Sequence, residues 1–475
     1  MKIFCLISLI KRPLLFLVPL FLAFGCSDEQ LVSDSIVTTE VDLNSAEDGA
    51  DLLGACTSCT YVVPAGTVIV DAAKLGLQPG SVIGLDARID YSNLLFRNLQ
   101  GTYDQPIIIR NCGGVARINA TGKNFGIKTE NSKFFRITGG QEKGEYGIIV
   151  TGGTMGVTLQ HLSTHFEVDH LEIQNSGFAG IMAKTDPGCD PATWRGNFVM
   201  KGIALHNNYI HDTGGEGIYA GNSFFMNGVD TPCGKQYPHE IHYIRIFGNI
   251  VRNTGWDGIQ LGSATHGASV HANVIENYGM KNINPQNSGI QIGEGTGGVC
   301  YNNLIKGGTG NGMVVLGLGD NIIYNNVIDQ AGNHGVFCDE RYSPGEGFVF
   351  LNNTILNPGG DGIRMYAEIL PGNVILNNII TNPGSYYTYS YPRNPEDAFV
   401  YKPADVDVLL SNNYFSIETA TLQLNGLQAV DYKCESTSPV IDKGADISAY
   451  NIRTDFNYKM RLRGAGYDIG AVENF

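Results

Sequence analysis

The chain has 475 residues, of which 43% are hydrophobic and 16% are charged, and its net charge is −15. This composition excludes a disordered chain, and the acidic balance argues against nucleic acid as a partner because phosphate binding needs a basic face. The length allows one large domain or two to three ordinary ones.

Residues 1–25 are predicted to be a targeting segment. Lys2, Lys11 and Arg12 accompany the apolar run PLLFLVPLFLAFG, which is too short to favour a membrane span. The letters LAFGC resemble a bacterial lipobox, which implies that Cys26 is lipidated and anchors the chain to a membrane. The following SDEQ resembles the export tag of Bacteroidetes surface lipoproteins, which implies the outer surface of a Gram-negative bacterium. A plain cleaved secretion signal is the alternative.

Residues 26–55 are polar and acidic and are expected to form a flexible tether. Loss of the signal lowers the basic residues from 31 to 28 against 46 acidic ones, so the net charge becomes −18. An exported chain can form disulfides. Cys56 and Cys59 form a CxxC without a second such pair, which disfavours zinc, and one of them can pair with Cys112 or Cys434.

An internal repeat dominates the rest of the chain. Seven stretches after Gly180 share one frame, among them DTGGEGIYA, NTGWDGIQL and PGGDGIRMY, and pieces such as NNYIHD and NNVIDQ precede most of them. Alternation of period two inside the pieces predicts strands, and glycines mark the turns. An apolar residue of the second piece recurs at steps of 23 to 41 residues, at Ile210, Val251, Ile275, Ile305, Ile328, Ile355 and Ile379.

This repeat resembles the right-handed parallel β-helix of the pectate-lyase-like kind. The resemblance implies an all-β, three-sheet solenoid over residues 56–415, with coils stacked at about 4.8 Å and with N- and C-terminal caps. SPVIDKGAD and YDIGAVE resemble a choice-of-anchor Q element, so residues 416–475 are expected to seal the last coil. A column of Asn resembles the asparagine ladder of such helices, at positions 208, 249, 273, 303, 326, 353 and 378.

The residue before each turn glycine forms a second column, with Glu216, Asp257, Ser288, Asn311, His334 and Asp361. In the fold that this chain resembles, the column borders the sheet along which related lyases and hydrolases bind substrate. The resemblance therefore implies a sugar-binding face of acids, amides, aromatics and a cation. Its expected substrate-binding members are Tyr219, Gln260, Gln291, His334, Asp361 and Arg364.

Glu216 and Asp257 are the predicted catalytic pair. On neighbouring coils their carboxyls could lie about 5 Å apart, as in a retaining glycosidase, and their repulsion would raise one pKa. The same two acids could instead hold a calcium ion. The alternative is structural, with the acids solvated or accepting hydrogen bonds from turn amides.

A lyase mechanism needs a base and a cation that neutralises a uronic carboxylate. The candidate cations are Lys184, Arg245, Arg252 and Arg364. Lys184 would lie beside the expected groove, and His211 could orient Glu216 or be structural. Insertions at 184–198 and 222–243 could carry specificity or simply pack over the helix, and Cys189 and Cys233 within them are expected to form a disulfide.

Together these features predict a monomeric, lipid-anchored surface protein. It is expected to bind polysaccharide and to degrade it as a lyase or glycoside hydrolase, with calcium as a candidate cofactor. The alternative is a non-catalytic glycan-binding or adhesin-type protein. Neither the NTD, GHG and RIK set of polygalacturonases nor another sharp signature is present.

Overall fold

A computed structural model describes residues 56–140, 146–340, 345–390, 392–425 and 432–474. The predicted signal peptide, Cys26 and the tether lie outside the described residues. Among the residues that are described, no helix is long and apolar enough to cross a membrane.

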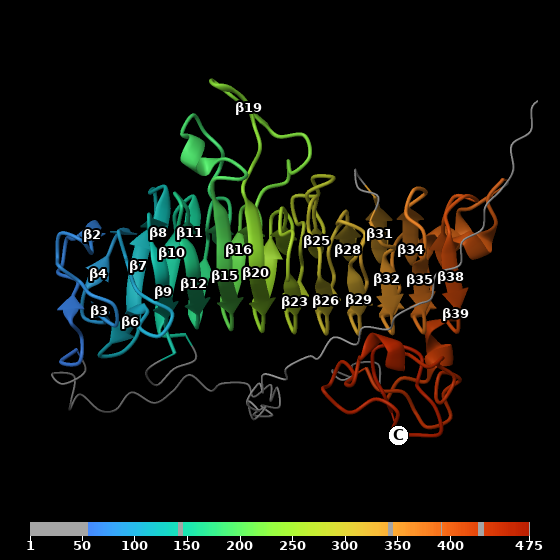
Figure 1. The fold of residues 1–475 in the computed structure, drawn as a ribbon. Helices are drawn as coiled ribbons and strands as arrows, with labels where there is room; N and C mark the ends of the chain where they lie inside the picture. The colour runs from blue at the N-terminus through green and yellow to red at the C-terminus, as the bar shows by residue number, and fades with distance from the viewer. Residues whose placement is uncertain (1–55, 141–145, 341–344, 391, 426–431, 475) are drawn as a thin grey trace, which may run out of the picture. The chain divides into compact units, whose positions relative to one another are not determined.

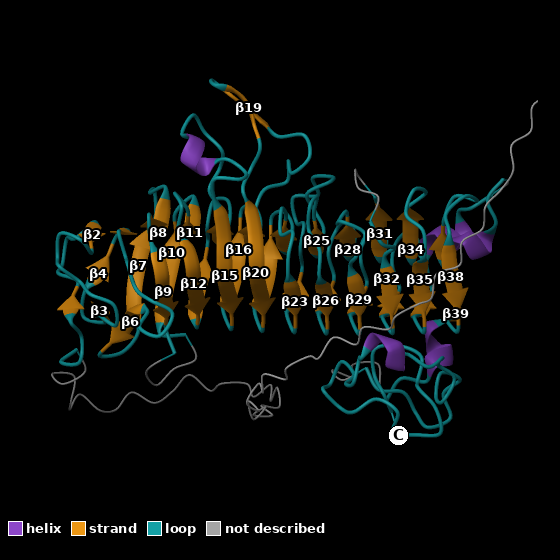
Figure 2. Ribbon diagram, viewed as in Figure 1, coloured by secondary structure: helices purple, strands orange, loops and turns teal. Residues whose placement is uncertain are grey.

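Three long parallel sheets make up the body (Figures 1 and 2). Sheet A consists of β1 (Tyr61–Val62), β3 (Val82–Asp86), β6 (Ile107–Cys112), β9 (Lys133–Thr138), β12 (Thr164–Asp169), β15 (Val199–His206), β20 (Glu240–Phe247), β23 (Ser269–His271), β26 (Val299–Tyr301), β29 (Ile322–Tyr324), β32 (Val349–Leu351), β35 (Asn373–Leu376) and β38 (Val408–Ser411). Sheet C consists of β4 (Asp90–Tyr91), β7 (Ala116–Ala120), β10 (Ile148–Gly152), β13 (Leu171–Gln174), β16 (Tyr209–Thr213), β21 (Ile250–Thr254), β24 (Val274–Glu276), β27 (Leu304–Lys306), β30 (Val327–Asp329), β33 (Thr354–Leu356), β36 (Ile379–Thr381) and β39 (Tyr414–Ser416).

Sheet B consists of β2 (Ile69–Asp71), β5 (Leu94–Arg97), β8 (Phe125–Glu130), β11 (Met155–Leu159), β14 (Ile181–Ala183), β17 (Ile218–Ala220), β22 (Ile259–Leu261), β25 (Ile290–Ile292), β28 (Met313–Val315), β31 (Val336–Asp339), β34 (Ile363–Tyr366) and β37 (Val400–Tyr401). Each coil contributes one strand to each sheet, and each strand pairs in parallel with its counterparts in the neighbouring coils. This arrangement is the predicted three-sheet parallel β-helix.

The asparagine ladder is confirmed and gains one member. The side-chain amide of each Asn donates to the side-chain oxygen of the Asn on the next coil, at 2.9–3.0 Å, from Asn208 through to Asn413. The ladder also corrects one predicted core position. Ile355 pairs with Ile380, so Ile380 continues the inward column. Ile379 instead packs against the C-terminal segment.

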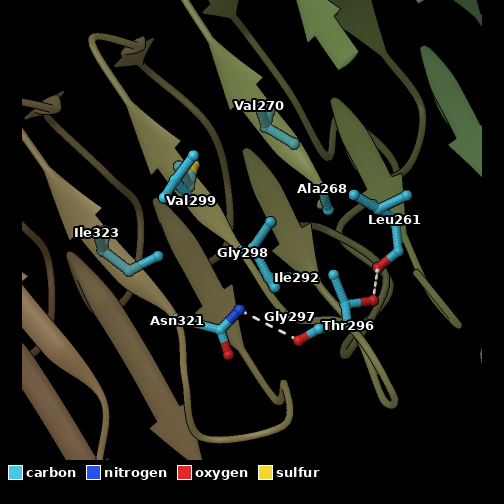
Figure 3. A pocket seen from close by; sticks show the side chains of 11 residues that line it. Leu261, Ala268, Val270, Ile292, Thr296, Gly297, Gly298, Val299, Asn321 and Ile323 are labelled. Carbon is cyan, nitrogen blue, oxygen red and sulfur yellow. Dashed lines mark hydrogen bonds between the residues drawn. The ribbon is translucent and has the colours of Figure 1, made fainter. Parts of the chain in front are cut away.

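Apolar side chains fill the interior from coil to coil. Figure 3 shows such a region, where Leu261, Ile292 and Ile323 come from successive coils. The only hydrogen bonds drawn there go to backbone carbonyls, from Asn321 Nδ2 to Thr296 O at 3.1 Å and from Thr296 Oγ1 to Leu261 O at 3.4 Å. Cys300 and Cys338 are buried in the same core, and burial raises the pKa of both thiols.

The two insertions pack on each other. The predicted Cys189–Cys233 disulfide joins them, and Trp194 bridges to Pro238. They include the short 3-10 helix η1 (Pro191–Thr193) and the hairpin of β18 (Val229–Thr231) and β19 (Gly234–Gln236). A second disulfide links Cys56 to Cys112, which resolves the pairing left open by the sequence.

The C-terminal segment does not seal the last coil as expected. It contains η4 (Thr419–Leu422) and η5 (Ser448–Tyr450), and it packs along the side of the helix. Side-chain amides of Asn302, Asn325, Asn352 and Asn377, on four successive coils, donate to its backbone carbonyls. At the end of the inward columns, Leu410 and Phe415 stay 42% and 37% exposed. The 3-10 helices η2 (Gly384–Tyr387) and η3 (Pro395–Ala398) lie before β37.

Candidate functional site

The turn column that contains Glu216 and Asp257 is a hydrogen-bonding ladder. Three of its side chains accept from the backbone N–H of the column residue on the next coil. Asp257 Oδ1 accepts from Ser288 at 2.6 Å, Asn311 Oδ1 from His334 at 3.2 Å, and His334 Nδ1 from Asp361 at 2.9 Å. Polar side chains at this turn therefore satisfy backbone donors that the interior would otherwise leave unpaired. The structural alternative from the sequence therefore describes Asp257, whereas Glu216 makes no such contact among the described residues, and Glu216 Oε2 and Asp257 Oδ2 are buried without a hydrogen-bond partner.

Glu216 and Asp257 do lie on neighbouring coils, since β17 pairs with β22, but the expectation that they are exposed is wrong. Glu216 is 1% exposed and Asp257 is fully buried. Burial raises the pKa of Glu216 to about 7, although Lys184 opposes the shift. Burial, with the charge of Glu216, raises the pKa of Asp257 to about 8. Both acids are thus largely or partly protonated near neutral pH, and neither faces solvent.

These two acids do not fit the predicted calcium site. Calcium takes six to eight oxygen ligands, commonly ionised carboxylates and waters. Here burial favours the protonated acids, and one oxygen of Asp257 is already used by the Ser288 amide. The positive charge of Lys184 also acts on Glu216. We therefore assign no role to calcium at this position.

The outward face of sheet B, where the groove was expected, is covered over these coils. Tyr219 and Gln260 are 8% and 5% exposed, and both hydrogen-bond to Ser223 Oγ of the 222–243 insertion. Gln291, one coil further on, pairs with Gln260 and is half-buried. Lys184 lies over the Tyr219 ring at 4.4 Å and pairs with Asp186 at 3.0 Å. The insertion therefore packs over the helix here.

His211, another predicted site residue, is engaged by protein carboxylates. The ring nitrogens of His211 face the carboxylates of Asp212 and Glu172 at 2.6 and 3.4 Å. Both nitrogens are taken on sheet C, so His211 makes no contact with Glu216 among the described residues. The role predicted for it is not supported.

Asp361 and Arg364 form a closed cluster on sheet B. The fully buried Asp361 carboxylate accepts from Ser385, Tyr389 and Arg364, and the Arg364 guanidinium also donates to Tyr366. The His334 ring beside this cluster is neutral at neutral pH, because burial lowers its pKa to about 4. This saturation leaves Asp361 unable to bind a substrate, contrary to the prediction.

A groove does exist, on the outer face of sheet A. It has a volume of about 470 Å³ and crosses β6, β9, β12, β15 and β20. At its centre the outward positions of β15 are Gly202 and Ala204, which carry no long side chain. Their neighbours in register are larger, so the small residues create the depression. The walls include Tyr103, Phe134, Arg136, His165, Glu167, Tyr243 and Arg245.

The aromatic wall is built on a column of left-handed backbone. Phe134, His165 and Tyr243 have φ of 53°, 52° and 59°, and Gly202 has φ of 58° between them. Left-handed φ is uncommon outside glycine, and strain of this kind, about 1–3 kcal/mol per residue, gathers at functional sites. The column interrupts the strand pairing and turns the rings outward, as a stacked bulge does. Phe134 stacks on His165 at 4.4 Å, and Tyr243 is 64% exposed.

Charged groups line the floor beside these rings. Arg136 binds Asp169 at 2.7 Å and Glu167 at 3.1 Å, and Glu167 Oε1 lies 3.0 Å from His206 Nε2. Burial would raise the pKa of Asp169, but hydrogen bonds from His170, Arg136 and Thr138 lower it to about 2. Asp169 is therefore ionised throughout the ordinary pH range.

Arg245 differs from the other candidate cations. Lys184, Arg252 and Arg364 each pair with a carboxylate, Arg252 with Glu276 at 2.6 Å. Arg245 is exposed in the groove and forms no ion pair with any described residue. On the opposite side of Gly202 and Ala204, burial and the charges of Lys201 and Lys133 lower the pKa of His165. A neutral imidazole and an available guanidinium therefore line one open groove.

Sequence reasoning named Arg245 but missed the groove around it. A signal was present in FFRIT, HFEVD, GIALH and YIRIF, which share the frame of β9, β12, β15 and β20. In that frame the outward residue changes from Arg136 through Glu167 and Ala204 to Arg245. The sequence repeat that sets the frame begins after Gly180, so Arg136 and Glu167 lie outside it.

Comparison with a family model agrees with the architecture. A family model for a right-handed β-helix region matches residues 239–395, and no curated protein sequence matches the chain. Similar solved structures include the pectate lyase Pel9A, with 13% identity, a TM-score of 0.46, and coverage of 88% of this chain and 97% of that one. The alginate lyase of Paenibacillus sp. str. FPU-7 has 18% identity, a TM-score of 0.40, and coverage of 65% and 98%. The GH136 lacto-N-biosidase of Eubacterium ramulus has 14% identity, a TM-score of 0.40, and coverage of 76% and 68%. The family model and the three parallel sheets confirm the predicted right-handed parallel β-helix.

Proposed function

We propose that the groove on sheet A binds an acidic polysaccharide and cleaves it by β-elimination, so that the protein is a polysaccharide lyase. The observation that carries this proposal is the exposed Arg245, which has no carboxylate partner among the described residues and shares the groove with a neutral His165. The guanidinium lies over the Phe247 ring at 5.6 Å, and without a carboxylate partner among the described residues it is suited to a carboxylate of the substrate.

The proposed reaction uses these two groups on opposite sides of the β15 depression. Arg245 neutralises the carboxylate of a uronic acid unit, which acidifies the neighbouring C–H. His165 accepts that proton, the electron pair forms a carbon–carbon double bond, and the glycosidic C–O bond breaks. The leaving oxygen takes a proton from water. A neutral imidazole is in the right state to act as the base.

Exposed rings would hold the polymer in place. Tyr103 and Tyr243 are 87% and 64% exposed, and Phe134 of β9 lines the same groove. Aromatic faces pack well on the apolar faces of sugar rings. A hydrolase that uses two carboxylates has less support, because Glu216 and Asp257 are buried and Arg136 binds both Glu167 and Asp169.

A panel of uronate-containing and neutral polysaccharides tests the proposal, read both for absorbance of unsaturated uronates and for new reducing ends. A lyase yields both signals on uronates. Reducing ends without absorbance would indicate a hydrolase, and binding without product would indicate the glycan-binding alternative; either result contradicts the proposal. Arg245→Ala should reduce activity by about 10- to 100-fold, whereas Arg252→Ala, on sheet C, should retain it.

We also propose a surface location through a lipid on Cys26. The support is the lipobox-like LAFGC and the acidic residues after it. Mass spectrometry of the mature N-terminus tests this proposal, and an unmodified or absent Cys26 would contradict it. The monomeric state and the absence of nucleic acid among its partners stay predictions.

A further inference from the structure

We propose that Glu240, His242 and His266 bind a divalent transition-metal ion of the zinc class at one end of the sheet A groove. One ligand atom from each of these residues lies within 4.8 Å of the others. This proposal does not depend on the lyase function.

The fold brings these residues together through strand geometry. Glu240 and His242 occupy alternate positions of β20, so their side chains leave the strand on one face. His266 belongs to the next coil and forms a parallel bridge with His242, and the two rings lie 4.4 Å apart between centroids. Two adjacent coils thus supply three ligands, of which two are imidazoles and one is a carboxylate.

Hydrogen bonds already orient the three side chains. His242 Nε2 lies 2.9 Å from Glu240 Oε2, the contact that a metal ion would replace. Thr265 Oγ1 donates to Glu240 Oε2 at 2.8 Å and lies 2.9 Å from His266 Nδ1. Metal-binding imidazoles ordinarily have such a partner on one ring nitrogen, which fixes the ring and leaves the other nitrogen for the metal.

The donor set selects the class of metal. Two imidazoles and one carboxylate suit Zn²⁺ and similar ions, whereas Ca²⁺ and Mg²⁺ prefer all-oxygen sites. Three protein ligands leave a coordination position open. The site is accessible, since His266 is exposed and the side chains of His242 and Glu240 are 20% and 27% exposed. The next residue, Tyr243, lines the groove, so the proposed metal site adjoins the groove along β20.

A second cluster on the same sheet shows the contrast. Glu167, Asp169 and His206 also lie within reach of one another. There the Arg136 guanidinium contacts both carboxylates and already supplies the positive charge. Among the described residues Glu240 forms no ion pair with an arginine or lysine, and its carboxylate instead meets His242 and Thr265, with the charge of Arg195 acting on it from further away.

The test is a calorimetric titration of Zn²⁺ into the full chain without a polyhistidine tag. The wild type should take up one ion, and His242→Ala and His266→Ala should each weaken binding by about tenfold or more, since even an outer partner is worth about 10–100-fold. Thr265→Val, which keeps all three ligands, should weaken binding less. His161→Ala serves as control, because this exposed His lies outside the cluster.

The proposal is overturned if the wild type binds no Zn²⁺ at micromolar concentration, if the His242→Ala, His266→Ala double variant binds as the wild type does, or if excess Ca²⁺ displaces Zn²⁺. Thermal melts establish that each variant is folded. Zinc uptake without cleavage of any glycan would contradict the proposed lyase function and leave the metal site standing. Cleavage without zinc uptake would do the reverse.

Discussion

The Asp257 carboxylate accepts a hydrogen bond from the backbone N–H of Ser288 at 2.6 Å, across one coil of the helix. This contact shows that Asp257 has a structural role. The sequence did not establish that role, because a single acid among turn residues is expected to be exposed. Burial, against the effect of this hydrogen bond, raises the pKa of Asp257, and burial also raises that of Glu216, so the two acids make stability depend on pH.

The first prediction concerns that pH dependence. The pKa of Asp257 is 3.8 ordinarily and about 8 when folded, and that of Glu216 is 4.5 and about 7. Between these values the folded state binds more protons than the unfolded state, so the free energy of unfolding falls as pH rises from about 4 to about 8. Asp257→Asn keeps the acceptor for Ser288 and cannot ionise. Thermal midpoints measured against pH should therefore have a shallower slope in this variant, and Glu216→Gln should act likewise.

Asp257→Ala is the matched comparison. It also cannot ionise, but it leaves the Ser288 N–H without its acceptor, which costs about 1–3 kcal/mol. Its midpoint should lie below that of Asp257→Asn at every pH. A folded Asp257→Asn protein with no cleavage of a substrate that the wild type cleaves would mean that this carboxyl is catalytic after all.

The second prediction concerns Tyr243, whose backbone is strained and whose ring lines the groove. Both Tyr243→Gly and Tyr243→Ala remove the ring from the groove, and each should weaken polysaccharide binding by about three- to tenfold, from a stacking contribution of about 0.5–1.5 kcal/mol. Only glycine adopts φ of 59° without strain. The glycine variant should therefore be more stable than the alanine variant by about 1 kcal/mol.

Urea unfolding measures the stability difference and affinity electrophoresis measures the binding. Tyr237→Ala is the control, because this residue is also exposed but belongs to the insertion away from the sheet A groove. Equal loss of binding in Tyr237→Ala would move the binding surface to the insertions.

The third prediction separates charge from shape at Arg245. A charged hydrogen bond to a carboxylate contributes about 1.5–3 kcal/mol, so Arg245→Ala should reduce kcat/KM on a uronate polymer by about 10- to 100-fold. Added salt should weaken binding by the wild type and have a smaller effect on the variant, because the screened ion pair is already absent. Carboxyl-reduced polymer should bind both proteins alike. An unchanged salt dependence in Arg245→Ala would show that the cation contacts no substrate carboxylate.

The fourth prediction concerns the asparagine ladder. Asn303 donates to Val270 O at 3.0 Å and to Asn326 Oδ1 at 2.9 Å, and it accepts from Asn273. Asn303→Ala removes these contacts inside a fully buried site and should lower the free energy of unfolding by about 2–4 kcal/mol. Asn119→Ala is the control, because that side chain is exposed on a regular strand and accepts only local hydrogen bonds from Thr121. Hydrogen exchange should show the loss of protection in the coils on both sides of Asn303, and similar stability in the two variants would contradict the ladder's role.

The repeat allowed the fold to be predicted closely, because each coil has the same sequence pattern of an inward apolar residue, an Asn and a turn glycine. Val270, Cys300 and Ile323 face inward in register, as the spacing requires. The position of a groove is a different kind of property. It depends on which outward residues are small, as at Ala204, and on which face the insertions cover, as Ser223 does over Tyr219. Such contacts join coils and loops of unequal length, so a frame of repeats cannot place them.

The C-terminal segment changes how the solenoid can come apart. In an ordinary repeat array each unit contacts only its neighbours, so the ends fray and unfolding proceeds unit by unit. Here Asn302, Asn325, Asn352 and Asn377 bind backbone that follows them by 153, 129, 116 and 68 residues. The C-terminal segment therefore contacts four coils at once, and these coils must unfold together. Because this segment follows the four coils in the chain, they reach their full stability only after residues 445–468 have been synthesised.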